Sequence, residues 1–568
     1  MEYDVIVRGG LVIDGTGAAP FKSDVGIRDG VIAAVGESVS GTAKSEIDAT
    51  GLVVSPGFID AHTHYDAQID WDPWLGSSGR HGVTTILMGN CGFTLAPVKP
   101  SDRDYVVQML TRVEGMPLEA LKDGVTWKWE SYGEYLDAID ASLGVNVMPQ
   151  VGHSAIRYYA MGLDACEREA TPDEVAAMEG LVKDAMASGA WGFTTSTSAM
   201  HNDSAGRPIP SRMAAPDEFV RLAAAMKDKP GALIGISPGT KFSGISPAER
   251  DLMIDMARAG DATVLWNPLK YSDQEPGLLD KMLTASAEAE ERGARIYAVF
   301  NPGPDGPMRL DMQNAFRFDI LPKWKSINVL PLKEKLAAYA DPVTRALLKK
   351  DLAEGEGLLA SGLRTMWPRI LVAEAFHPEN KTYVGSKIQD IAEREGVEPI
   401  DIFLDIAVRD ELQTVFMQEE RTETSSATAA MDRASASKYV VYGGSDAGAH
   451  LDFMSNEGMP SRAIARRVRE EGRYSLEGIV HGFTGRVADV LGLQGRGRLQ
   501  VGAAADVTVF DMASIGVSDP YMAADLPGGS ARLSTDAVGI QYTLVNGVMA
   551  YEKGKVTTTP AGKLLRRH

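Results

Sequence analysis

The chain has 568 residues, of which 44% are hydrophobic and 24% charged, and its formal net charge is −20. This composition argues against disorder and fibrous structure, and an acidic chain repels the phosphate backbones of nucleic acids. Only two cysteines are present, which excludes a disulfide scaffold. No apolar run reaches the length of about 18 residues that spans a bilayer, and MEYDVIVRGG lacks an export-signal pattern. We therefore expect a cytoplasmic protein without membrane or nucleic-acid partners.

The first 56 residues are rich in short apolar or alternating runs. Asp14-Gly15 and Asp29-Gly30 separate some of these runs, and Asp-Gly between apolar runs is a strong turn signal. Several short strands at this spacing predict a small β-sandwich. The expected strands are Tyr3–Val7, Leu11–Ile13, Asp24–Ile27, Val31–Val35 and Ser45–Asp48.

From Gly57 onward, short apolar strands alternate with amphipathic helices. A capping residue followed by proline, as at Thr171-Pro172 and Ser246-Pro247, is typical of a helix start. This alternation predicts a parallel (β/α)8 TIM-like barrel over residues 57–489. The clearest expected strands are Val83–Met88, Val145–Val151, Trp191–Thr195, Ala232–Ile236, Thr263–Trp266, Arg295–Val299, Thr414–Phe416 and Val440–Tyr442. The clearest expected helices are Pro172–Ser188, Pro216–Lys227, Pro247–Ala259 and Leu278–Arg292.

A long helical segment at about 303–385, rich in Trp, Met and Leu, interrupts the alternation. It is expected to be an insertion packed on the barrel rim, with an active-site lid as the alternative. Strands return near the end of the chain, at Gly497–Val501, Asp506–Phe510, Gly539–Val545 and Val548–Tyr551. We expect residues 1–56 and 490–568 to build one composite β-sandwich beside the barrel.

The most informative segment is PGFIDAHTHYD, in which His62 and His64 end a short apolar strand at Phe58–Ala61. Residues i and i+2 of a strand point the same way, so the two imidazoles face one point. Active sites of such barrels lie at the carboxyl ends of the strands, and imidazole is a common zinc ligand. This context favours a metal site over two hydrogen-bonded surface histidines.

Two further residues follow expected barrel strands. Cys91, in MGNCGF, could be a metal ligand or nucleophile, whereas the ordinary alternative is a small buried hydrophobe. Asp446, in YGGSDAGAH, could bind the same metal and transfer a proton, whereas the alternative is a turn-capping aspartate. Cys166 is expected to be an ordinary buried residue.

Several side chains are candidates for substrate contacts. His153 and Arg157, in GHSAIR, could contact a substrate carboxylate, and a loop-fixing hydrogen-bond network is the equal alternative. Lys270 is another candidate carboxylate partner, and Tyr65, next to His64, is a candidate substrate contact. His201 and His450 lie in no recognisable motif.

These motifs, in this order, resemble the amidohydrolase superfamily and, within it, the N-acyl-D-amino-acid deacylase (D-aminoacylase) group. The resemblance runs from end to end and rests on six segments: YDVIVRGGLVIDGTG, PGFIDAHTH, GVTTILMGNCGF, GHSAIR, GRLQVGAAADVTVFD and VNGVMAYEKGKVTTTPAGKLLR. It implies a (β/α)8 barrel with a flanking β-sandwich and a zinc-dependent amide hydrolase.

The resemblance also assigns roles to individual residues. His62, His64, Cys91 and Asp446 match metal-site residues, and Asp446 matches the family's general acid/base. Lys270 lies one residue away from a family lysine associated with the substrate carboxylate.

The chain also departs from the family pattern. Two further family histidines on the fifth and sixth strands are absent, and Ser237 and Asn267 stand at or beside their positions. Neither residue type is a good zinc ligand, which favours one divalent ion, expected to be zinc, over two. The family's arginine-bearing stretch after the last-strand aspartate is also absent.

The sequence therefore predicts a metal-dependent hydrolase of an amide bond in a small-molecule substrate. Hydrolysis of a cyclic amide or imide, or of a lactone or ester, would use the same parts. A metal-free, non-catalytic ligand-binding paralogue is a third reading, motivated by the two missing histidines. Homo-oligomerisation and the substrate's acyl group are left open by the sequence.

Overall fold

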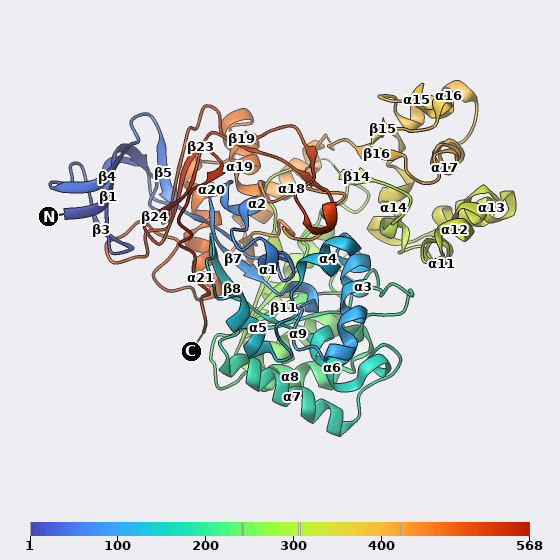
Figure 1. Cartoon of the computed structure of the whole chain (residues 1–568), viewed down its shortest axis with the longest axis horizontal. Coiled ribbons are helices and arrows are strands. Elements are labelled where there is room, and N and C mark those ends of the chain that lie inside the picture. The colour runs from blue at the N-terminus through green and yellow to red at the C-terminus, as the bar shows by residue number, and fades with distance from the viewer. Residues whose placement is uncertain (1, 240–243, 305, 307, 421, 568) are drawn as a thin grey trace.

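The computed structural model describes residues 2–239, 244–304, 306, 308–420 and 422–567. A parallel β/α unit at the centre carries a sheet built from both chain ends on one side and a helical lobe on the other (Figure 1). Within the described ranges, no helix is both long and apolar enough to cross a bilayer.

The central unit is the predicted (β/α)8 barrel. One parallel sheet contains three strands and a second contains six, and the pair β8 and β9 forms a single strand interrupted at Gln150. The described residues thus supply eight strand positions. In order around the barrel these are β6 (Phe58–Asp60), β7 (Val83–Met88), β8 and β9 (Asn146–Pro149 and Val151–Gly152), β10 (Gly192–Ser196), β11 (Leu233–Ser237), β12 (Thr263–Trp266), β13 (Arg295–Phe300) and β17 (Val440–Tyr442).

Helices connect these strands and cover the outside of the barrel. The predicted start at Thr171-Pro172 is confirmed, because the Thr171 side chain and Glu174 form a reciprocal capping box with the helix backbone. The main covering helices are α6 (His153–Met161), α7 (Pro172–Ala187), α8 (Pro216–Ala224), α9 (Pro247–Gly260), α10 (Leu278–Glu291), α18 (Ser425–Ala436), α20 (Leu476–Phe483) and α21 (Gly485–Leu491).

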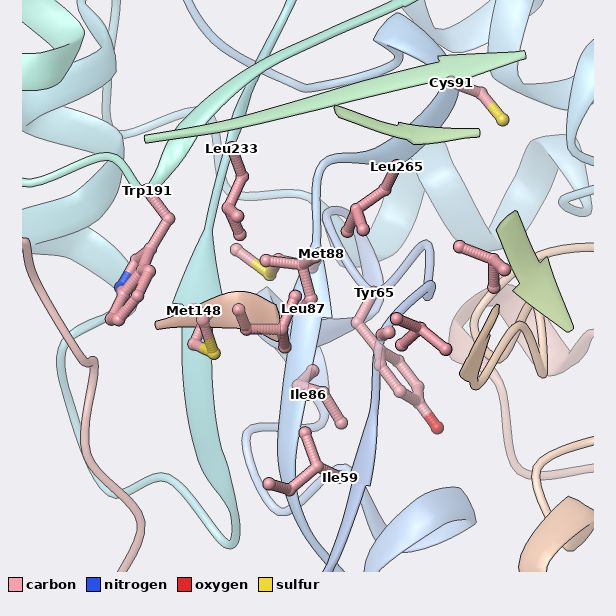
Figure 2. Close-up of a cluster of buried hydrophobic side chains, with 14 of the residues drawn as sticks. Ile59, Tyr65, Ile86, Leu87, Met88, Cys91, Met148, Trp191, Leu233 and Leu265 are labelled. Atoms are coloured by element: carbon pink, nitrogen blue, oxygen red, sulfur yellow. The ribbon is translucent and has the colours of Figure 1, made fainter. Parts of the chain in front are cut away.

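Apolar side chains fill the barrel below its carboxyl-terminal rim. Ile59, Leu87 and Met148 are among the fully or almost fully buried residues of one continuous core. In Figure 2 these side chains gather around β7, and Cys91 lies beyond the end of that strand, away from Ile59. The packed core therefore leaves the strand ends as the place for polar chemistry.

Both chain ends contribute to one nine-stranded sheet beside the barrel. β5 (Val53–Pro56) lies at the junction, since it pairs in parallel with β1 (Glu2–Val12) and antiparallel with β18 (Val507–Phe510). The remaining strands are β2 (Phe21–Arg28), β3 (Val31–Gly36), β4 (Thr42–Asp48), β23 (Ile540–Val545), β24 (Val548–Glu552) and β25 (Lys555–Val556). The expected strand at Gly497–Val501 is not formed, because those residues lie in turn and irregular structure.

The helical lobe has a hydrophobic core of its own, which runs from Leu310 to Phe416. Its helices include α11 (Pro322–Asn328), α12 (Leu332–Ala340), α13 (Pro342–Glu354), α14 (Gly357–Arg364), α16 (Ile388–Glu395) and α17 (Pro399–Arg409). The prediction of Thr414–Phe416 as a barrel strand is wrong. β16 (Val415–Gln418) instead pairs antiparallel with β14 (Met308–Leu310) and β15 (Ile370–Glu374) at the base of this lobe. The strand ending at Asp60 completes the barrel in its place.

Replacement of Gly192 by alanine should destabilise the barrel. An added Cβ would overlap the backbone carbonyl of Leu233 on the neighbouring strand, and overpacking of this kind costs about 1–3 kcal/mol. Gly180→Ala is the matched control, because its Cβ meets nothing within 4 Å inside helix α7 and should stabilise by about 0.5–1 kcal/mol. Urea unfolding measures both, and equal midpoints for the two variants would contradict the prediction.

Candidate metal centre

The imidazoles of His62 and His64 lie at the carboxyl-terminal rim, just after β6, the first strand of the barrel. His62 and His64 follow β6, their side chains are only 5% and 4% exposed, and their rings meet edge to face at 5.1 Å between centroids. The Asp60 carboxylate accepts a hydrogen bond from the His62 backbone N–H. The i, i+2 spacing thus brings both rings to one place, as predicted.

The loop after the second strand carries Cys91 in a constrained conformation. Cys91 has φ 55°, which is left-handed and costs energy for a residue other than glycine. The Asn90 amide donates hydrogen bonds of 3.0 Å to the carbonyls of Thr63 and Leu87, so it ties this loop to the one bearing the histidines. The sulfur of Cys91 consequently lies 3.7 Å from Nε2 of His62.

The loop after the last strand closes onto the first. Asp446 also has a left-handed φ of 55°, and its backbone N–H donates to the carbonyl of His62. The carbonyl of Ala447 accepts from the His64 N–H at 2.7 Å. Gly448 packs so closely that an added Cβ would lie 2.6 Å from the carbonyl oxygen of His64. These contacts fix the Asp446 carboxylate over the two imidazoles.

The four predicted metal residues therefore come together. Oδ1 of Asp446 lies 3.3 Å from Nε2 of His62 and 3.7 Å from Nε2 of His64. One ligand atom from each of His62, His64 and Cys91 lies within 4.8 Å of the others. Two imidazoles, a thiol and a carboxylate around one point match the donor set that zinc prefers.

The protonation state of His64 also suits a ligand. Burial lowers the pKa of His64 well below its usual value, and the charges of His62, His450 and His201 lower it further. A neutral imidazole is the form that coordinates a metal. The same interactions place His201 and His450, which the sequence did not single out, in the electrostatic surroundings of the centre.

The positions of the missing family histidines lie at the same rim. Ser237 ends β11, and Asn267 directly follows β12, where its backbone N–H donates to the Ile236 carbonyl.

The sequence did not single out Glu114 either. Its buried carboxylate lies 3.5 Å from Nδ1 of His64, on the side of the ring opposite to Asp446. No motif surrounds Glu114, so the sequence offers no signal for it beyond its place before Gly115.

His153 and Arg157 lie in a buried network. Both side chains are fully buried and share the carboxylate of Glu218, at 2.8 and 2.9 Å. Burial raises the pKa of Glu218, but the hydrogen bonds and charges of His153 and Arg157 outweigh it and hold that pKa below its usual value. The geometry matches the loop-fixing alternative, while a contact of either side chain with substrate remains a prediction.

Tyr65 and Lys270 remain predictions as substrate contacts. Tyr65 is fully buried and its hydroxyl lies 2.6 Å from that of Ser78. Lys270 is half-buried and follows β12 on the loop that begins at Asn267. Asp446 is the most accessible member of the centre: 32% of its side chain is exposed, and it lines a small pocket together with Glu457 and Arg532.

The carboxyl-terminal rim of a parallel β/α barrel thus carries two histidines, a cysteine and an aspartate, a set of side chains that could hold a metal ion. The chain matches the amidohydrolase family model over residues 45–305 and 373–551 and belongs to that family. The internal stretch between the two matched ranges falls largely within the helical lobe.

Similar proteins span the whole chain. A Mycobacterium tuberculosis protein of uncharacterised function is 32% identical, covering 98% of this chain and 93% of its own length. The D-aminoacylase of Alcaligenes xylosoxydans xylosoxydans is 26% identical, with 100% and 98% covered. A solved D-aminoacylase structure, from work on one-metal activation and second-metal attenuation of its binuclear metal centre, has a TM-score of 0.65 at 26% identity, with 100% of both chains covered.

Glu218→Gln should destabilise the protein strongly. The substitution removes the charge that compensates buried Arg157, and breaking a buried pair costs about 3–5 kcal/mol. The control is Glu179→Gln, which loses a partly exposed pair with Arg221 and should cost less than about 1 kcal/mol. Urea midpoints compare the two, and a Glu218→Gln midpoint as high as that of the control would show that the network contributes little.

Proposed function

We propose that the protein is a metal-dependent amidohydrolase that cleaves an amide bond, most like an N-acyl-D-amino-acid deacylase. The observation that carries this proposal is the position of Asp446, whose carboxylate oxygen lies within 3.7 Å of Nε2 of both His62 and His64 at the strand ends. Fold alone does not fix an activity, so the proposal rests on this site in a member of the amidohydrolase family.

His62, His64 and Asp446 would hold one divalent ion, with Cys91 as an adjacent ligand. When bound, a zinc-like ion polarises a carbonyl group and makes water acidic enough to lose a proton near neutral pH. The number of ions proposed is one, because Ser237 and Asn267 stand where further imidazoles would be needed. The one-metal activation described for a similar D-aminoacylase is consistent with such a centre.

Asp446 is the proposed proton carrier. Its carboxylate takes the proton of the attacking water and later delivers it to the leaving nitrogen, so that the amide yields a carboxylic acid and an amine. The partial exposure of this side chain, beside imidazoles that are almost fully buried, lets a substrate reach it. The buried histidines hold their places while the aspartate faces the reacting atoms.

The proposed substrate is a small N-acylated amino acid. The full-length similarity to a D-aminoacylase supports this class. Lys270, on the loop after β12, is proposed to pair with the substrate carboxylate. Cyclic amides and lactones are the alternative substrates, since their hydrolysis needs the same water activation and proton transfer.

Asp446→Asn should abolish turnover while preserving the fold. The amide has nearly the same shape but cannot accept the water proton, and loss of a general base costs about 10²–10⁴-fold in rate. The measurement is initial rate with an N-acyl-D-amino acid, alongside thermal unfolding. Asp519→Asn, at an exposed position far along the chain, is the control; activity in Asp446→Asn equal to this control would refute the mechanism.

His62→Ala and His64→Ala should each remove the bound metal. Elemental analysis of the purified protein should find about one divalent ion per chain, and much less in either variant, because each loses an imidazole ligand. A screen over N-acyl-D-amino acids, their L-enantiomers, hydantoins and lactones then assigns the substrate class. Metal content unaffected by both substitutions would support a non-catalytic paralogue or a different site.

A further inference from the structure

His64 lies between two carboxylates, and only one of them belongs to the proposed metal site. Its Nε2 faces Oδ1 of Asp446 at 3.7 Å, whereas its Nδ1 faces Oε1 of Glu114 at 3.5 Å. Nε2 of His62 faces the same Asp446 oxygen, so the centre lies on the Nε2 side of both rings. A neutral imidazole carries one proton, and a ring that binds through Nε2 must keep that proton on Nδ1.

Glu114 is placed to accept that proton. The Nδ1 atom of His64 is buried and has no hydrogen-bond partner among the described residues, and a buried N–H without an acceptor costs about 1–3 kcal/mol. The 3.5 Å separation between Nδ1 and Oε1 is a close contact of the two groups, longer than a typical hydrogen bond. The other Glu114 oxygen, Oε2, lies 3.9 Å from Nε2 of His450.

The backbone fixes Glu114 firmly in this position. Glu114 is the C-terminal cap of α3 (Arg103–Val113), with its N–H bonded to the Leu110 carbonyl and its own carbonyl accepting from the N–H of His450. Gly115 follows with φ +55°, and a Cβ there would lie 3.3 Å from Cα of His450. The residue after Glu114 must therefore be small and left-handed for the carboxylate to reach His64.

Burial makes a purely structural role costly. The Glu114 side chain is only 3% exposed, and an ionised carboxylate out of water needs compensating donors. The imidazoles of His64 and His450 both face this carboxylate. The His450 ring in turn stacks on the ring of Phe316, with 5.6 Å between centroids and 4° between planes.

We propose that Glu114 is a positioning residue of the metal centre: its carboxylate holds the proton on Nδ1 of His64 and thereby keeps Nε2 unprotonated and aimed at the metal. Such carboxylate–histidine–metal arrangements set ring orientation and ligand basicity. This inference rests on the proposed function, since it requires that His64 bind a metal.

The test measures metal binding directly. Metal-free wild type, Glu114→Gln, Glu114→Ala and the control Glu119→Gln are titrated with Zn²⁺ against a chromophoric chelator. Glu119 is exposed and pairs only loosely with Lys122 at 3.5 Å. The Kd should rise by about 10–100-fold in Glu114→Ala and by less in Glu114→Gln, whose amide oxygen still accepts from Nδ1. Glu119→Gln should keep the wild-type value.

Two further readouts separate positioning from folding. The visible spectrum of the Co²⁺-loaded protein should change in both Glu114 variants, and the Tm of metal-free Glu114→Gln should equal that of metal-free wild type. Wild-type Kd and spectrum in both variants would overturn the proposal, as would a weakened Kd accompanied in both by a matching fall in metal-free Tm. If wild type binds no Zn²⁺, or His62→Ala binds as tightly, the proposed metal site itself fails, which is visible without the Glu114 variants.

Discussion

Barrel closure is the constraint on which the site depends. The loop after β17 joins the loop after β6 through the His64 N–H to the Ala447 carbonyl and the Asp446 N–H to the His62 carbonyl. The Asp60 carboxylate also accepts from the Gly444 N–H, a contact between residues 384 positions apart. These hydrogen bonds, which we call the seam, join the loops after β6 and β17 and set the position of the Asp446 backbone relative to the two histidines.

Burial shifts the pKa values of titratable groups near the seam in a way that would favour a bound cation. Burial lowers the pKa of His64 and raises the pKa of Asp60, and it raises the pKa of Asp66 to about 8. In each case the low-dielectric interior favours the neutral form of the group. A divalent ion at the Nε2 atoms would reverse this balance for carboxylates nearby, because its charge compensates theirs. A cation bound at this rim and the nearby acidic groups would therefore stabilise one another.

The sequence was most informative where local pattern and geometry coincide. The His-x-His spacing after an apolar strand predicted the positions of His62 and His64, and helix starts such as Thr171-Pro172 were confirmed. The prediction of Thr414–Phe416 as a barrel strand was wrong, because a short apolar run has the same sequence pattern in a barrel strand and in the small antiparallel sheet of the lobe. Glu114 could not be found because its proposed role depends on a contact with His64, 50 positions earlier in the chain, which no local periodicity encodes.

The absence of the two family histidines leaves the candidate metal ligands on one side of the barrel rim. The candidate ligands follow β6, β7 and β17, which are neighbours at the seam. Further around the barrel, β11 ends at Ser237 and Asn267 directly follows β12. A donor set confined to one side of the rim is consistent with the single ion proposed above, since serine and asparagine are poor zinc ligands. The absence of the two family histidines is therefore compatible with the proposed amide hydrolysis, provided that the seam keeps Asp446 over both imidazoles.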